Sequence, residues 1–274
     1  MATNDKERGQ DAEIARIKRV ADRLGLKLGK PERAGSEANL AGIRSESVLI
    51  SRRLDSRTWF VQDRPDEPKR SPNDYFGGSD RTLVARGRKV LEVLGIPSDE
   101  IAEELVLEER TRSAQVDRKG KISQGQIQKG TKILRMNRAV RGCPVWSSNV
   151  VLRLTKGGRI IFLQVHWPDV SAAVLEEASE LVHRVKAGWL PPPQEEASPE
   201  SVEAGIIHSP AAGFVMDVYA AIRVIYEPWN QRYGRKLMLH FDRHGRPIPN
   251  PRIGELKDEP PRRRQSPEDC EPKR

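Results

Sequence analysis

Three potential metal ligands stand close together near the end of the chain. His240, Asp242 and His244 occupy positions i, i+2 and i+4, which share one face of a strand if the strand runs through all three. Imidazole nitrogens together with a carboxylate suit zinc and similar transition metals. However, Gly245 and Pro247 predict that the strand ends near Asp242, so that His244 turns away from the other two side chains. The sequence therefore predicts no metal site.

The sequence also lacks the patterns that usually mark an enzyme active site. It contains no G-x-S-x-G, H-E-x-x-H, P-loop or G-x-G-x-x-G motif. Its two cysteines, Cys143 and Cys270, have no metal-type spacing and are expected to be free thiols. Cys143 precedes Pro144 in a predicted packed turn, which favours a structural role over a reactive one. We therefore predict that the protein is not an enzyme, with no catalytic residue and no cofactor.

A run of basic residues is the clearest candidate binding surface. The net charge is +9, and lysines and arginines follow one another from Lys119 to Arg141 without an intervening carboxylate. A polyanion or an acidic partner would contact these predicted binding residues: Lys129, Lys132, Arg135, Arg138 and Arg141. The alternative is a solvated loop and outer strand face that is kept basic to discourage pairing at a sheet edge.

The composition indicates one folded region with polar tails. Of the 274 residues, 36% are hydrophobic and 32% are charged. No run approaches the roughly 18 apolar residues that span a bilayer, so no membrane association is predicted. Residues 1–13 contain no apolar signal core, so the chain as written is expected to be cytoplasmic. Residues 1–45 and 252–274 are predicted to be removable without unfolding the remainder, because they are polar.

Three consecutive strands are predicted in the centre of the chain. They cover residues 135–141, 148–154 and 160–167. Their side chains alternate or are rich in Ile, Val and Phe, as in half-buried strands. The segment Gly142-Cys143-Pro144-Val145-Trp146 is predicted to be a bulged junction between the first two strands, and Lys156-Gly157-Gly158 closes a tight hairpin between the last two. Trp146 and Trp167 are predicted to pair across the sheet.

The order of these residues resembles the propeptide region of fungalysin and thermolysin-type metalloproteases with its adjoining PepSY domain. In that family a basic strand, a G-x-P-V segment, a second strand, a turn ending in G-R and a third strand follow one another. The matching residues are Arg135, Gly142, Pro144, Val145, Val150, Val151, Gly158 and Arg159. The segment Thr155-Lys156-Gly157 replaces the acidic turn that is usual in the family.

The resemblance implies a cystatin-like fold and covers roughly residues 80–250. It also implies a structural motif made of Gly142, Pro144, Val145, Trp146, Gly158 and Arg159. Propeptides of this family act as inhibitors and intramolecular chaperones of a protease domain, and this sequence contains no such domain. They belong to exported precursors, which conflicts with the cytoplasmic expectation.

Two helices are predicted, each followed by antiparallel strands. Ser79 is an N-cap for a helix over residues 80–94, and Ser171 starts a second helix that ends near Ala187. Residues 117–130 are expected to form a polar loop. The predicted fold class is α+β, with two helix-plus-antiparallel-sheet units of the cystatin or PepSY kind and flexible terminal tails. The predicted boundaries are 1–78 for an N-terminal helix and extended connector, 79–170 and 171–250 for the two units, and 251–274 for a disordered tail.

Three functions are compatible with these patterns. The leading hypothesis is a noncatalytic module that binds another protein, with a protease among the candidate partners. A basic adaptor that binds nucleic acid or an acidic assembly surface through residues 119–141 is the first alternative. A structural subunit of a larger assembly is the second. The sequence predicts neither the identity of the partner nor the oligomeric state.

Overall fold

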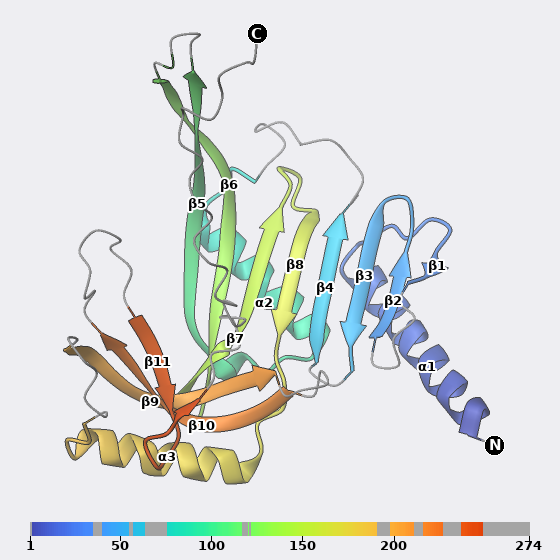
Figure 1. Cartoon of the computed structure of the whole chain (residues 1–274). Helices are drawn as coiled ribbons and strands as arrows, with labels where there is room; N and C mark the ends of the chain where they lie inside the picture. Colours follow the sequence, from blue (N-terminus) through green and yellow to red (C-terminus); the bar gives the residue numbers. More distant parts are fainter. Residues whose placement is uncertain are drawn as a thin grey trace, which may run out of the picture.

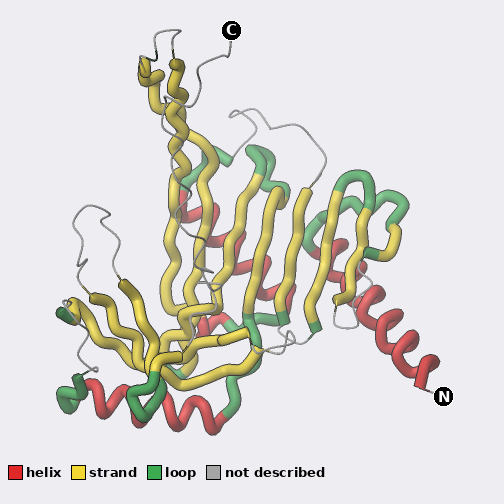
Figure 2. Tube along the Cα trace, viewed as in Figure 1, coloured by secondary structure: helices red, strands yellow, loops and turns green. Residues whose placement is uncertain are grey.

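Strands dominate the structure, a computed structural model, and three helices lie against them (Figure 2). The structure describes residues 2–34, 40–54, 57–63, 76–116, 120, 122–190, 198–210, 216–226 and 237–248. The helices are α1 (Ala2–Arg23), α2 (Asp80–Leu94) and α3 (Ala172–Lys186), and a short 3-10 helix covers Ser98–Glu100. Within the described ranges, no helix is long and apolar enough to cross a membrane.

The strands form one sheet of twelve. They are β1 (Glu32–Arg33), β2 (Leu40–Arg44), β3 (Val48–Arg53), β4 (Thr58–Asp63), β5 (Ile101–Val116), β6 (Ile122–Val140), β7 (Cys143–Leu154), β8 (Ile160–His166), β9 (Pro199–Pro210), β10 (Met216–Tyr226), β11 (Leu237–Phe241) and β12 (Pro247–Ile248). The main path runs β1-β2-β3-β4-β8-β7-β9-β10-β11-β12, and the long hairpin of β5 and β6 branches from β7.

The prediction of two separate helix-plus-sheet units is wrong, because β7 belongs to both halves of one curled sheet. Its later residues pair with β6 and β8, while Val145 near its start pairs in parallel with Ile206 of β9. The other strand pairs are antiparallel, so the sheet is mixed. Figure 1 shows β9, β10 and β11 at the lower left, across the lower ends of β6, β7 and β8. The sequence predicted a break near the start of β7, the strand that joins the two halves. This is why one sheet was divided into two cystatin-like units.

The predicted break between the first two central strands is a hairpin turn in the structure, and β7 follows it as an unbroken strand. Arg141 and Gly142 have φ values of 50° and 78°, and Val140 pairs with Cys143 across them. Two successive residues with positive φ are typical of a two-residue turn that matches the twist of the flanking strands. The irregularity lies further on, because the β6–β7 pairing skips residues 146–148. The predicted junction is therefore wrong in position.

The expected polar loop over residues 117–130 is also wrong for most of its length. Strand β6 begins at Ile122 and pairs with β5, with Val116 opposite Ile122 at the far end. The pairing has three register irregularities, which twist a long ribbon away from the rest of the sheet. Figure 1 shows this hairpin projecting beyond the neighbouring strands. A ribbon needs fewer apolar residues than a packed strand, which explains why its polar sequence resembles a loop.

The two predicted helices are confirmed, and each covers one part of the sheet. Ser79 and Ser171 accept hydrogen bonds from the backbone N–H groups of Thr82 and Val174, as N-caps do. α1 and α2 pack on the part that contains β2 to β8, and this core includes Leu91. α3 packs on β9 and β10 around a second core.

The N-terminal segment is part of the first core, which argues against the expectation that residues 1–45 can be removed without unfolding the remainder. Ile17 and Ala21 of α1 are completely buried, and Ile43 of β2 is almost so. The apolar stripe of α1 rests on β2 and β3. A helix that buries such a stripe contributes hydrophobic stabilisation, although most of its residues are polar.

The packing of α1 predicts a large effect of a single core substitution. Replacing Ile17 with Ala should lower the free energy of unfolding by about 2–5 kcal/mol, because it leaves a cavity between α1 and the sheet. Urea denaturation of the full chain measures the change. The variant Arg19→Gln, at an exposed position of the same helix, is the control and should leave the midpoint almost unchanged. Equal midpoints for both variants would show that α1 does not pack as described.

Candidate anion-binding site

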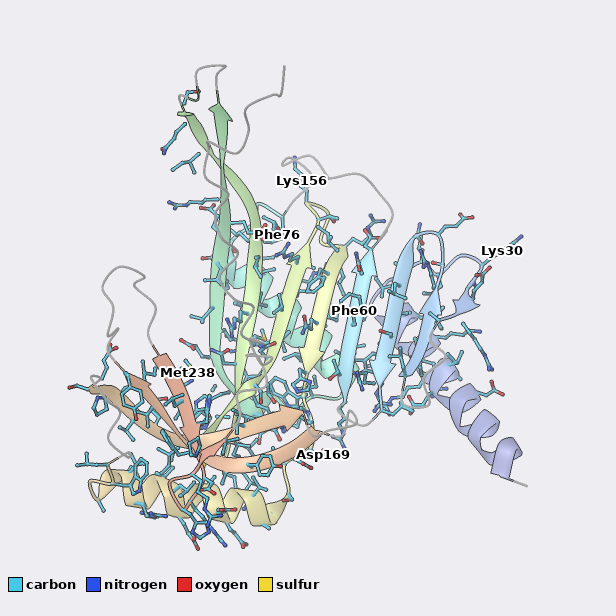
Figure 3. All side chains as sticks on the ribbon, in the orientation of Figure 1. Lys30, Phe60, Phe76, Lys156, Asp169 and Met238 are labelled. Carbon is cyan, nitrogen blue, oxygen red and sulfur yellow. The ribbon has the colours of Figure 1, made fainter. Side chains whose placement is uncertain are left out.

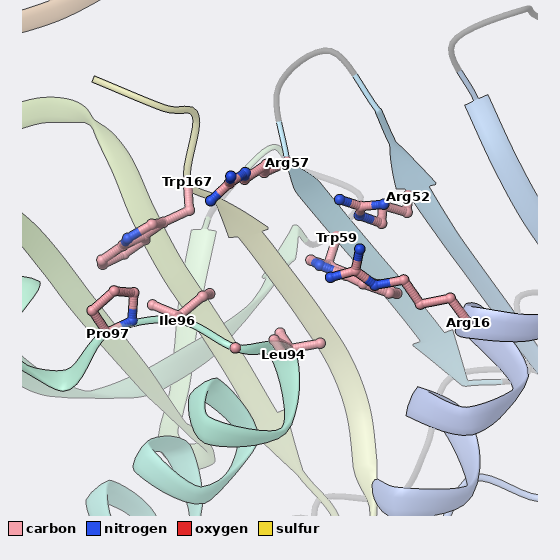
Figure 4. A pocket seen from close by; sticks show the side chains of 9 residues that line it. Arg16, Arg52, Arg57, Trp59, Leu94, Ile96, Pro97 and Trp167 are labelled. Atoms are coloured by element: carbon pink, nitrogen blue, oxygen red, sulfur yellow. The ribbon is translucent and has the colours of Figure 1, made fainter. Parts of the chain in front are cut away.

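A pocket of about 200 Å³ opens where both helices of the first core meet the ends of three strands. It is lined by Arg16, Arg52, Arg57, Trp59, Leu94, Ile96, Pro97 and Trp167, and we refer to it as the Arg/Trp pocket. Figure 4 shows Trp167 beside Ile96 and Pro97 on one side, and Trp59 with the arginines of α1 and β3 on the other. Apolar and aromatic surfaces thus form the walls, and guanidinium groups surround the opening.

The end of α2 shapes one wall of the pocket. Gly95 adopts the left-handed conformation with φ of 74°, and its N–H group donates to the carbonyl oxygen of Glu92. The next N–H group, of Ile96, donates to the carbonyl oxygen of Leu91 at 2.9 Å. This cap ends the helix abruptly and directs Ile96 and Pro97 toward the sheet. The glycine that ends α2 therefore also shapes the site.

Arg52 is the most buried cation in the pocket lining. It faces Trp59 across the β3–β4 hairpin, where the two residues are direct partners, and its guanidinium carbon lies 5.4 Å from the centre of the indole ring. Its Nη1 donates to Oε2 of Glu13 in α1 at 2.6 Å. The side chain is only 9% exposed, and its buried Nε has no hydrogen-bond partner within the described residues. A buried donor without a partner favours a ligand that supplies an acceptor.

The other two arginines leave the pocket with a surplus of positive charge. Arg57 forms an ion pair with Asp169 at 3.0 Å, and both side chains are largely exposed. Arg16 lies 3.9 Å from Glu13, the carboxylate that Arg52 already holds at shorter range. Three guanidinium groups therefore share two carboxylates. Arginine and tryptophan side chains carry N–H donors and no strong acceptor, so the polar groups of the walls are complementary to an anion.

The wall formed by Trp167 is held from behind by a buried ion pair. The indole Nε1 donates to Oε2 of Glu100 at 2.8 Å, and Nε of Arg138 donates to the same oxygen at 2.8 Å. The guanidinium carbon of Arg138 lies 5.0 Å from the centre of the Trp167 ring. Burial lowers the pKa of Arg138, and the charge of Glu100 opposes that effect. The pocket wall thus depends on a cation that has little access to water.

The polar network continues from Arg138 into the second half of the sheet. Its Nη1 donates to the carbonyl oxygen of Pro168 at 2.6 Å and lies 3.5 Å from Oγ of Ser148. Ser148 is in turn 3.1 Å from Nε2 of His208 in β9. Burial, together with smaller effects of the neighbouring His166 and Arg138, lowers the pKa of His208 to about 3. His208 is therefore neutral at physiological pH, in a position that ligands do not reach.

The basic residues predicted to bind a polyanion do not share one surface in the described part of the chain. Lys132 donates to Oδ1 of Asp80 at 2.7 Å, Arg138 is buried, and Arg141 is exposed in the β6–β7 turn. Arg135 is half-buried on β6, and the side chain of Lys129 lies outside the description. Binding of nucleic acid or an acidic assembly through residues 119–141 stays a prediction.

The residues of the propeptide-like motif occupy two separate turns and the start of β7. Val145 is buried, and the neighbouring Pro144 and Trp146 lie on the opposite face of β7, where both approach Gly205. Gly158 has φ of 80° in the β7–β8 turn. The next residue, Arg159, donates to Asp63 at 2.8 Å.

Two further predictions about site residues have clear structural outcomes. Trp146 does not pair with Trp167, because its ring lies 5.4 Å from that of His240 and beneath the guanidinium of Arg223.

His240 is buried, and burial together with Arg223 lowers its pKa to about 4. Asp242 accepts the backbone N–H groups of the following turn, where His244 is exposed. Among the described residues, no group of three metal-binding side chains comes together.

Sequence reasoning missed the residues of the Arg/Trp pocket because they come from distant segments. The one local signal is the alternation of residues 48–53 and 58–63, which aligns Arg52 with Trp59 once the hairpin register is known. The positions of Arg16 and Trp167 depend on how α1 and β8 pack.

Comparisons with known proteins identify no family. No protein-family model matches the chain, and no curated protein matches it. One solved structure, an uncharacterized protein from Eubacterium rectale, is similar with a TM-score of 0.47. The alignment has 12% sequence identity and covers 88% of this chain and 82% of the other. The resemblance to metalloprotease propeptides therefore stays a prediction.

The ion pair behind Trp167 predicts a large loss of stability when one partner is removed. Replacing Glu100 with Gln leaves the Arg138 guanidinium buried without a counter-charge, which should cost about 3–5 kcal/mol. Denaturation of the full chain measures the loss. The matched control is Glu104→Gln, because Glu104 pairs with Arg88 on the surface and should matter little. Similar losses for the two variants would contradict the buried role of Arg138.

The buried His208 predicts a specific dependence of stability on pH. Its pKa is about 6.5 in an unfolded chain and about 3 in the folded protein, so only the unfolded state takes up a proton between these values. Its contribution is complete above pH 6.5 and is lost as the pH falls toward 3. Between about pH 7 and pH 4.5 the wild-type protein should lose on the order of 2–3 kcal/mol that His208→Gln does not lose. Parallel stability profiles for both proteins would contradict a neutral, buried His208.

Proposed function

We propose that the protein is a noncatalytic binding module whose Arg/Trp pocket takes an acidic side chain of a partner protein. The observation that carries the proposal is the surplus of guanidinium groups around Arg52, whose buried Nε lacks an acceptor within the described residues. An additional carboxylate balances the third guanidinium and accepts hydrogen bonds from the exposed guanidinium groups of Arg16 and Arg57. Arginine suits this purpose because its planar group binds carboxylates with several N–H donors.

The dimensions of the pocket support a side chain as the ligand. Its volume of about 200 Å³ equals that of roughly seven water molecules. Pockets that enclose whole drug-sized molecules or cofactors usually measure about 300–1,000 Å³. An aspartate or glutamate side chain fits the smaller volume, and its methylene groups can contact the indole walls of Trp59 and Trp167.

The chemistry of the lining supports binding without catalysis. The described lining side chains are arginine, tryptophan, leucine, isoleucine and proline. None of these types acts as a nucleophile or exchanges protons near neutral pH. The serine–histidine contact between Ser148 and His208 is buried behind the pocket wall and joins a histidine whose pKa is far below neutral.

Glu13 is not a lining residue, but it acts as an internal counter-charge for two arginines of the pocket. Its carboxylate lies 2.6 Å from Arg52 and 3.9 Å from Arg16, which are the interactions that an external carboxylate would make. An incoming ligand therefore shares or displaces this group. We expect modest affinity for a single acidic side chain, since new contacts replace existing ones instead of adding to them.

Calorimetric titration of the full chain with a blocked tetraglutamate peptide tests the proposal. Arg16→Gln should weaken binding about two- to fivefold, because it removes one partly exposed charge from the pocket. Glu13→Gln should strengthen binding by about the same factor while lowering stability, because it removes the internal competitor and the partner of Arg52. The two variants thus move affinity in opposite directions.

The control variant is Arg19→Gln, which removes the same charge one turn along α1 at an exposed position outside the pocket lining. It should bind like the wild-type protein. A tetraglutamine peptide should bind to none of the variants. Equal weakening by Arg16→Gln and Arg19→Gln, or binding of both peptides, would show that the pocket is not the site.

A further inference from the structure

A second cavity, of about 240 Å³, lies between α1 and α2 next to the β7–β8 turn. Val90, Leu154 and Ile160 contribute apolar surface to it, and all three are mainly buried in the first core. Arg23, at the end of α1, also lines the cavity. We refer to it as the α1–α2 cavity. It shares no lining residue with the Arg/Trp pocket.

Positive charge surrounds this apolar surface. Arg23, Arg86 and Lys89 are exposed lining residues, and within the described residues none of them forms a hydrogen bond or an ion pair. Asp22 is the single carboxylate in the lining. This arrangement differs from that of the Arg/Trp pocket, where internal carboxylates already hold each arginine. The cations of the α1–α2 cavity are therefore available to an external anion.

Two turns with left-handed glycines border the cavity. Gly25 follows α1 with φ of 71°, and Gly158 lies in the β7–β8 turn with φ of 80°. A Cβ atom at Gly158 would lie 3.6 Å from Nη2 of Arg86, an ordinary contact distance, so this guanidinium lies beside the turn. At Gly25 a Cβ atom would meet nothing within 4 Å.

We propose that the α1–α2 cavity binds a short amphiphilic carboxylate as a free small molecule. Its alkyl body would contact the apolar surface of Leu154 and Ile160, and its carboxylate would pair with Arg86 and Lys89. The combination of buried apolar surface with unpaired cations fits neither a simple salt ion nor an uncharged hydrocarbon. The volume, that of roughly eight water molecules, fits an acid of about six carbons.

Calorimetric titration of the full chain with hexanoate tests this proposal. Acetate, which has the carboxylate without the long alkyl chain, and hexanol, which has the alkyl chain without the charge, are the comparison ligands. Hexanoate should bind measurably more tightly than either. The double variant Arg86→Gln/Lys89→Gln should weaken hexanoate binding by roughly five- to tenfold, because two exposed charges are lost. The control variant Arg19→Gln/Arg81→Gln removes the same charge from exposed positions of the same two helices and should bind normally.

Three outcomes would overturn the proposal. Equal binding of hexanol and hexanoate would show that the cations take no part. Equal weakening in the two double variants would show that overall charge, and not the cavity, attracts the acid. Loss of hexanoate binding in Arg16→Gln would place the acid in the Arg/Trp pocket. Because that variant belongs to the other pocket, the two proposals can fail independently.

Discussion

The buried guanidinium of Arg138 is the constraint on which much of the structure depends. A cation removed from water is tolerated only when a counter-charge and hydrogen-bond acceptors surround it. Here Glu100 provides the charge, and the carbonyl oxygen of Pro168 and the hydroxyl of Ser148 provide further acceptors. These groups precede β5, follow β8 and lie within β7. Satisfying one side chain therefore fixes three distant segments, and it fixes Trp167, which shares the oxygen of Glu100.

The bend of the sheet begins at the same place. Opposite Arg138, the β6–β7 pairing skips residues 146–148, and extra residues in one strand increase its local twist. The start of β7 stays paired with the end of β6 but not with β8, and on its other edge it pairs with β9. Gly205 permits this close approach, because a Cβ there would lie 2.6 Å from the carbonyl oxygen of Pro144. One curled sheet with two cores results, and both cores contain residues of β7.

Local features of the fold could be predicted, whereas the pairing of distant strands could not. The helices that begin after Ser79 and Ser171 were predictable because capping and a 3.6-residue apolar period are properties of a single segment. The continuity of β7 was not, because Gly142 and Pro144 stand close together in the sequence and such residues usually interrupt a strand. The first half of β6 is polar, and only its partner β5 makes it a strand. In the same way, Arg138 resembles a surface cation in the sequence, because its counter-charge, Glu100, comes close to it only in the folded protein.

The candidate sites show that tertiary packing decides how strongly a given arginine can attract an anion. Arg16 and Arg23 lie on one helix two turns apart, but they face different environments. The first shares Glu13 with a buried arginine over a tryptophan ring, so an anion gains there only by replacing an existing interaction. The second forms no ion pair with the described residues and is exposed, so water and salt weaken its attraction for an anion. Specificity at the Arg/Trp pocket thus comes from competition with internal carboxylates, whereas at the α1–α2 cavity it must come from the apolar surface beneath the cations.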